Sequence, residues 1–299
     1  MTYLQIPRLI LSVFNLLLCG IALSSVAMPL FASAESRSRE PQVSADQLVR
    51  QVVENEVKMA ESDHSRWMYR QHHVDDDADV EKECVDSTLG AVCRRLAENG
   101  RRLSPQDQEK EKARLLELGR DPQQQLKLQE ARKKDNDKAL NMLKMLPEAF
   151  EYRYEETSGT LVRLRFEPNP NFDPPSREAR VFHAMVGFMW VDPNGKRIAE
   201  LSGRLVKDVD FGFGLLGRLY QGGTFHVKRD NVGYNHWETT LLDVRIRGRA
   251  LFFKTIKADQ HETADNFKRI DGNPSVAQAA KMLQDESSFL QASNASNVP

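Results

Sequence analysis

Apolar and polar residues alternate along much of the region between positions 188 and 270, which predicts a run of β-strands joined by short turns. Arg247-Gly248-Arg249 is short enough to reverse the chain between the last two strands. Such short connections join antiparallel strands, because a parallel neighbour needs a crossover of a dozen or more residues. We expect a meander that curls into a sandwich, a barrel or a half-barrel. The expected strands cover residues 188–190, 196–206, 224–228, 237–246 and 250–257.

Further strands are expected upstream, at residues 64–72, 80–85, 91–96, 150–156 and 161–166. In the last of these, Val162, Leu164 and Phe166 share one face, and Arg163 and Arg165 share the other. This alternation is typical of a sheet with one apolar and one solvated face.

Helical spacing of apolar residues occurs between positions 41 and 61, where Ser44 and Gln47 have the spacing of a capping box. A second helical region begins at Ser104-Pro105, a serine cap followed by proline at the first helical position. We expect Gly119 to end this helix, Asp121-Pro122 to begin another, and Pro147 to end that one. Shorter helices are expected at 177–185 and 275–290.

The expected fold is therefore mainly β (α+β). It is a curved antiparallel sheet or incomplete β-barrel of about ten strands, with packed helices. One domain covers residues 35–272, and residues 105–146 form a charged helical hairpin inserted in it. This hairpin is either a solvated surface element or a device that docks a partner. Residues 273–299 form a C-terminal helix and a tail.

The first 34 residues have the pattern of a secretory signal peptide. A basic start is followed by an apolar stretch and by Ala32-Ser33-Ala34, an A-x-A cleavage site. We therefore expect a periplasmic location. The alternatives are an uncleaved anchor, since the apolar stretch is long, and lipidation of Cys19.

Cys84 and Cys93 remain after cleavage, and they flank a strand–turn–strand pattern. If the turn centres on Thr88-Leu89, the two residues face each other, and a disulfide is expected in an oxidising compartment. A register shifted by one residue would leave two free thiols on opposite faces.

Residues 212–217 match G-x-G-x-x-G, but antiparallel strand signals flank them, whereas dinucleotide binding needs a parallel strand–helix unit. An apolar flap or ordinary core packing accounts better for the phenylalanines and leucines around these glycines. His72-His73 and the acidic turn after them either bind a divalent ion adventitiously or form a polar surface turn. The acids lack the order of a calcium loop.

No catalytic motif is present: G-x-S-x-G, H-E-x-x-H and S-x-x-K are all missing from the sequence. The net charge of −1 is unlike a nucleic-acid-binding surface. We therefore expect a protein that is not an enzyme and that uses no cofactor, metal, nucleotide or nucleic acid.

Several motifs resemble a family of exported bacterial proteins described as outer-membrane lipoprotein-sorting proteins, of the LolA/LolB-like superfamily. They are LPEAF (146–150), FEPNP (166–170), GFMWVD (187–192), FGFG (211–214), GGTF (222–225), RALFFK (249–254) and, upstream, RLAENGRRLS (95–104). The resemblance implies a curved antiparallel sheet closed by helices around an apolar cavity. It also implies transport of lipid or of the acyl chains of lipoproteins.

The leading hypothesis is a non-catalytic periplasmic carrier that binds lipid or an acylated lipoprotein in an apolar half-barrel. The alternative is a sensing or scaffold module that docks an envelope protein through the charged hairpin. An envelope hydrolase would need an acid, a histidine and a nucleophile clustered in a cleft. The candidate cavity residues are Val162, Leu164, Phe166, Trp190, Phe211, Phe213, Leu215, Leu216, Phe225, Trp237, Leu242, Val244, Ile246 and Phe252.

Overall fold

The computed structural model describes residues 43–176, 178–211, 217–250 and 254–285. The predicted signal peptide and the end of the tail lie outside these ranges. The strands are β1 (Arg66–Val74), β2 (Asp79–Ser87), β3 (Gly90–Glu98), β4 (Arg101–Arg102), β5 (Phe150–Ser158), β6 (Leu161–Pro168), β7 (Met185–Asp192), β8 (Arg197–Leu205), β9 (Val209–Phe211), β10 (Gly217–Leu219), β11 (Thr224–Gly233), β12 (His236–Ala250) and β13 (Lys254–Ile270). The helices are α2 (Ala45–Ser62), α3 (Pro105–Arg120), α4 (Pro122–Ala149), the 3-10 helix η1 (Glu178–Ala184) and α5 (Val276–Asp285).

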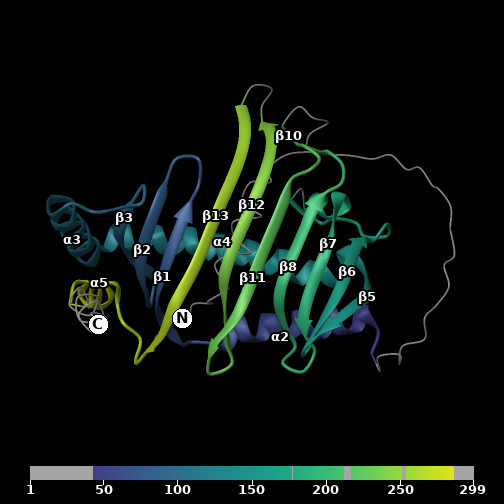
Figure 1. Cartoon of the computed structure of the whole chain (residues 1–299), viewed down its shortest axis with the longest axis horizontal. Coiled ribbons are helices and arrows are strands. Elements are labelled where there is room, and N and C mark those ends of the chain that lie inside the picture. Colours follow the sequence, from purple (N-terminus) through teal and green to yellow (C-terminus); the bar gives the residue numbers. More distant parts are fainter. Residues whose placement is uncertain (1–42, 177, 212–216, 251–253, 286–299) are drawn as a thin grey trace, which may run out of the picture.

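All thirteen strands belong to one open sheet, in the order β4-β3-β2-β1-β13-β12-β11-β8-β7-β6-β5 (Figure 1). The short β9 and β10 pair with each other, and β10 also pairs with β12. Every strand pair is antiparallel. The prediction of a mainly β chain with a large antiparallel sheet is confirmed, although the sheet has more than the expected ten strands.

The predicted reversal at Arg247-Gly248-Arg249 is wrong, because these residues continue β12. Gly248 pairs with Leu219 of β10 on one side and with Ile256 of β13 on the other. A side chain at Gly248 would collide with the backbone of Arg218, so glycine here permits the close approach of β10 rather than a turn.

The predicted helix starts are confirmed in their local contacts. The Ser44 hydroxyl accepts a hydrogen bond from the Gln47 backbone N–H at 3.2 Å, and the Ser44 N–H donates to the Gln47 side chain at 3.3 Å. Ser104 caps α3, and Asp121 caps α4 through the N–H groups of residues 123 and 124. Both hydrogen bonds of the Ser44–Gln47 capping box are therefore formed.

Pro147 was expected to end the second hairpin helix, but α4 continues to Ala149. Proline lacks an N–H, so the carbonyl of Leu143 loses its helical hydrogen bond, and the proline ring also crowds that carbonyl. Burial of Leu146 and Ala149 holds the last turn in place, and the Tyr152 hydroxyl donates to the Leu146 carbonyl at 2.9 Å. Tertiary packing thus overrides the local signal.

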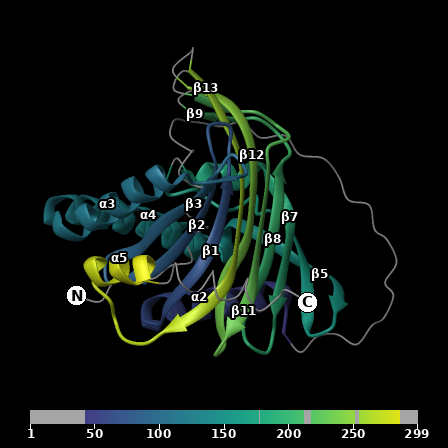
Figure 2. The ribbon, with the colours of Figure 1, turned by 60° about the vertical axis from the view of Figure 1, so that its left-hand side comes forward.

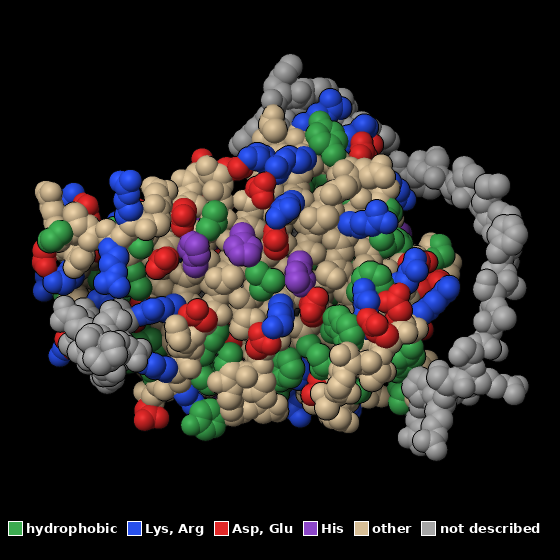
Figure 3. Space-filling model, viewed as in Figure 1, with side chains coloured by type: hydrophobic (Ala, Val, Ile, Leu, Met, Phe, Trp, Pro, Cys, Tyr) green, Lys and Arg blue, Asp and Glu red, His purple; other side chains and the backbone are tan. Residues whose placement is uncertain are grey.

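Helices α2 and α4 cross the same face of the sheet, and the sheet bends around them, so the covered face is concave (Figure 2). Val49 and Val52 of α2, Leu143 of α4 and Met189 of β7 are all nearly inaccessible within one apolar cluster. The opposite face of the sheet carries charged side chains and histidines (Figure 3). Among the described residues, no helix has the length and apolar character that a membrane span needs.

The hairpin of α3 and the first half of α4 lies at the β2–β3 end of the sheet, together with α5 (Figure 1). Leu115 of α3 packs against Leu283 of α5 in a small second core. On the other face of β2 and β3 a disulfide joins Cys84 and Cys93, which face each other across the two strands. The turn between these strands has two residues, because Ser87 pairs with Gly90.

Candidate functional site

A cavity of about 50 Å³ lies between α4 and the concave face of the sheet. Small-molecule sites usually enclose about 300–1,000 Å³, and one water needs about 10–15 Å³ of such volume. The space is therefore far smaller than an acyl chain, and such a ligand could enter only if the surrounding elements moved apart. The cavity is lined by Leu143, Leu146, Phe150, Tyr152, Phe166, Phe182, Met185, Met189, Ile198, Leu201, Phe225, Val227 and Arg229.

The structure places half of the candidate cavity residues in the apolar layer around this space. Two of these residues, Phe166 and Phe225, line the cavity itself. A further candidate, Val162, is partly buried and packs against the apolar layer. The buried candidates are Leu164, Phe166, Phe211, Phe225, Leu242, Val244 and Ile246. The candidates Phe213, Leu215, Leu216 and Phe252 lie outside the described residues.

Trp190 is a correction, because it lies on the solvent-facing side of the sheet. Its neighbours Met189 and Val191 are fully buried, and successive strand residues point to opposite faces. On that outer face the guanidinium of Arg163 lies 5.7 Å from the Trp190 ring. Trp237 also does not line the cavity, and its ring lies 5.8 Å from the guanidinium of Arg197.

The sequence analysis did not predict the cavity residues on α4, nor Arg229, the charged residue among those that line the cavity. The apolar positions of Leu143 and Leu146 have helical spacing, and this signal could have identified them. Arg229 follows Phe225 and Val227 at the inward-facing positions of β11, but its charge would ordinarily assign it to the solvated face.

Three buried charges lie next to this cavity. Glu56 of α2 accepts hydrogen bonds from Arg197 Nε at 3.0 Å and from the Ile198 backbone N–H at 2.8 Å, and its Oε1 lies 2.8 Å from Arg229 Nη1. Each of the three side chains is no more than 5% exposed. Burial alone would raise the pKa of Glu56, but the two guanidiniums outweigh it and lower the pKa. Glu56 is therefore a buried carboxylate that joins α2 to the sheet.

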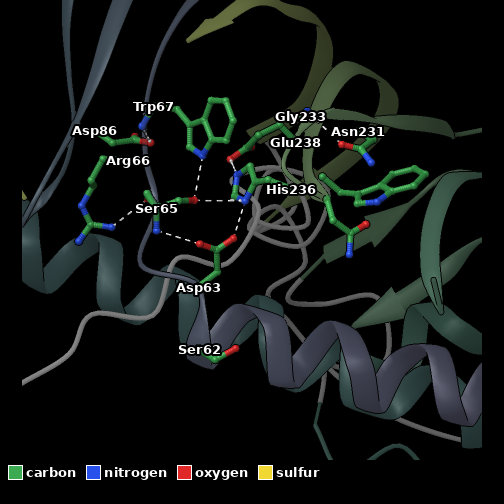
Figure 4. A network of polar contacts seen from close by, with 12 residues as sticks. Ser62, Asp63, Ser65, Arg66, Trp67, Asp86, Asn231, Gly233, His236 and Glu238 are labelled. Carbon is green, nitrogen blue, oxygen red and sulfur yellow. Dashed lines mark hydrogen bonds and ion pairs between the residues drawn. The ribbon is translucent and has the colours of Figure 1, made fainter. Parts of the chain in front are cut away.

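A second polar group surrounds His236, where α2 leads into β1 (Figure 4). His236 Nδ1 contacts Asp63 and lies 3.3 Å from the Ser65 hydroxyl, while Nε2 lies 2.9 Å from Glu238. The imidazole stacks on Trp67 with 4.8 Å between ring centroids, and the Trp67 indole donates to Ser65 at 2.9 Å. The group borders a depression of about 500 Å³.

The chemistry of this group is that of an ion pair rather than a nucleophile and base. Burial alone would lower the pKa of His236, but hydrogen bonds to Asp63 and Glu238 raise it to about 9. Both ring nitrogens therefore carry protons at neutral pH, and neither can accept a proton from Ser65. The Asp63 pKa is correspondingly well below its usual range, despite the opposing effect of burial.

The histidines of the acidic turn do not converge on one point. His72 pairs with Asp79 at 2.7 Å, whereas His73 pairs with Asp75 at 3.0 Å and with Glu262 at 3.1 Å. Adjacent residues of β1 point to opposite faces of the sheet, which separates the two imidazoles. In the described part of the chain, no three His, Cys, Asp or Glu side chains are placed to hold one metal ion.

Comparisons with protein-family models, curated proteins and solved structures find no match to this chain. The candidate functional site is therefore defined by its geometry: an apolar interior between α4 and the sheet, with a buried charge cluster beside it.

Proposed function

We propose that this protein is an exported, non-catalytic periplasmic carrier that holds an acyl chain between α4 and the concave face of its sheet. One observation carries the proposal: the gap beneath α4 is lined almost wholly by apolar and aromatic side chains. Burial of a methylene group contributes about 0.8 kcal/mol. A chain of about twelve methylenes therefore gains roughly 10 kcal/mol, which offsets the cost of moving a helix.

The position of Pro147 supports α4 as the element that moves. The missing N–H of Pro147 leaves the Leu143 carbonyl without its helical partner. Leu143 and Leu146, which line the gap, lie within this weakened turn. Bending at this point would lift both leucines from the sheet and enlarge the cavity.

The carrier function predicts that purified protein takes up a neutral NBD-labelled diacylglycerol, measured by the increase in NBD fluorescence. Leu201→Trp should weaken uptake at least tenfold, because a larger ring fills the gap that Leu201 lines. Overpacking should also cost about 1–3 kcal/mol of stability, so folding is checked by circular dichroism.

Leu241→Trp is the matched control for this experiment. Leu241 is also partly buried, but it precedes the buried Leu242 and faces the outer side of the sheet. Uptake should be unchanged in this variant. If wild-type protein takes up no probe and carries no lipid in organic extracts analysed by mass spectrometry, the carrier function is excluded.

A second candidate function is docking of an envelope protein through the α3–α4 hairpin. Leu116, Leu126 and Leu128 are 40–53% exposed there, although large apolar side chains are usually buried. Leu116 also borders a surface depression of about 660 Å³ at the junction of the two helices. An exposed apolar surface with a charged surround is typical of protein–protein contacts.

Docking predicts that Leu116→Gln with Leu126→Gln removes specific proteins from a cross-linked pull-down of envelope extract, with stability changed by less than about 0.5 kcal/mol. Tyr220→Gln is the control, because Tyr220 is similarly exposed, at 40%, away from the hairpin. A set of captured proteins that is identical for wild type and both variants would rule out docking through these leucines.

A further inference from the structure

We propose that the ligand of the apolar interior is a free fatty acid, and that Arg229 binds its ionised carboxylate. This inference rests on the proposed carrier function and specifies the chemistry of its ligand. Two observations on Arg229 support it: a side-chain donor without an acceptor, and a local excess of positive charge. The proposal of an acyl-chain carrier used neither of them.

The Arg229 side chain is buried and has a donor without an acceptor. It is 5% exposed and borders the apolar cavity. Its Nη2 donates to the Trp237 carbonyl at 3.0 Å, and its Nη1 lies 2.8 Å from Glu56. Its Nε has no hydrogen-bond partner among the described residues. Buried guanidinium N–H groups are normally satisfied. Arg94, Arg163 and Arg180 also have an unpartnered nitrogen, but only Arg229 lines the apolar cavity, so its Nε is the one that a ligand there could satisfy.

The charge balance around Arg229 also favours an anion. Glu56 is the only carboxylate described within ion-pair distance of Arg229 or Arg197, and it serves both guanidiniums. The next carboxylate, Asp63, contacts His236 and also attracts Arg197, which leaves Glu56 as the only carboxylate described near Arg229. Burial, together with the nearby Arg229, lowers the pKa of Arg197 despite the attraction of Glu56 and of Asp63. A carboxylate that entered the cavity would balance this buried excess of positive charge.

Ligands with neutral ends would leave that excess in place. An acyl ester or amide offers carbonyl oxygens, whereas an ionised carboxylate accepts two parallel hydrogen bonds from a guanidinium and is a stronger acceptor. The rest of the cavity lining is apolar or aromatic, and its single hydroxyl, on Tyr152, donates to the Leu146 carbonyl. Arg229 is therefore the residue that would distinguish a fatty acid from a neutral lipid.

The experiment measures displacement of the neutral NBD-labelled diacylglycerol by palmitate and by hexadecanol, which have the same chain length. Wild-type protein should bind palmitate at least tenfold more tightly than hexadecanol at pH 7.5. Arg229→Met should abolish this preference while keeping hexadecanol binding. The variant retains a one-to-one Glu56–Arg197 pair, so it is expected to fold. Arg245→Met, which removes an exposed guanidinium of β12, is the control and should retain the preference.

Carbon-13 NMR of carboxyl-labelled palmitate gives a second readout that does not depend on stability. In wild-type protein the pKa of the bound carboxyl should lie below that of palmitate on Arg229→Met. Equal affinity for palmitate and hexadecanol, or a preference that persists in Arg229→Met, would overturn the inference and leave the carrier function intact. Absence of binding by every lipid would remove both.

Discussion

Replacing Glu56 by glutamine should lower the free energy of unfolding by about 3–5 kcal/mol, because it leaves two buried guanidiniums without a carboxylate. Glutamine keeps the shape of the side chain, and its carbonyl can still accept from the Ile198 N–H. The loss therefore reports the charge of Glu56 rather than its packing. Urea unfolding followed by circular dichroism measures the difference.

Glu54→Gln is the matched control, since Glu54 is exposed on the same helix. A surface substitution of this kind should change stability by less than about 0.5 kcal/mol. If Glu56→Gln and Glu54→Gln unfold at the same urea concentration, the buried ion cluster contributes no stability. In that case α2 is held on the sheet by its apolar packing and by its other polar contacts, such as those of Asn55 and Asp46.

The second large effect is a loss of stability at alkaline pH that depends on His236. Its pKa rises from 6.5 in the unfolded chain to about 9 in the folded protein, which corresponds to about 3 kcal/mol. A raised folded-state pKa stabilises fully below pH 6.5. The contribution disappears as the pH rises from 6.5 through 9, when the imidazolium between Asp63 and Glu238 loses its charge.

The measurement is the free energy of unfolding at intervals from pH 6 to pH 10 for wild type and for His236→Gln. The wild-type advantage should shrink by about 2–3 kcal/mol over this interval. His73, whose pKa is also raised, chiefly by its hydrogen bond to Glu262, titrates in both proteins and cancels in the difference. His261→Gln, which alters an exposed histidine, should follow the wild-type curve. A pH-independent difference between wild type and His236→Gln would contradict this account.

Local signals predicted a large part of the fold. The capping box at Ser44 and the proline after Ser104 mark helix starts through contacts within one turn, and both occur. Alternation along residues 161–166 identified the buried face of β6, because strand side chains alternate whatever the neighbouring strand is. The facing positions of Cys84 and Cys93 follow from a two-residue turn that the sequence already indicated.

The errors have a common physical origin, which is that a long-range contact outweighed a local preference. Gly248 continues β12 because β10 approaches its backbone, and Pro147 stays within α4 because the residues on either side of it are buried. Trp190 is apolar, and its residue type alone favours an interior position. Only pairing with β6 shows that it shares a face with Arg163.

The sequence by itself determined that the chain forms antiparallel strands and capped helices, since these depend on residues close together along the chain. It also determined the apolar face of β6. The tertiary structure alone decided that Glu56 meets Arg197, 141 residues away, and that Asp63 meets His236, 173 residues away. Pairing of buried charges depends on strand order and on helix placement, and no local pattern encodes either of them. The charged part of the candidate site, including Arg229, could therefore be recognised only from the packing of α2 and α4 on the sheet.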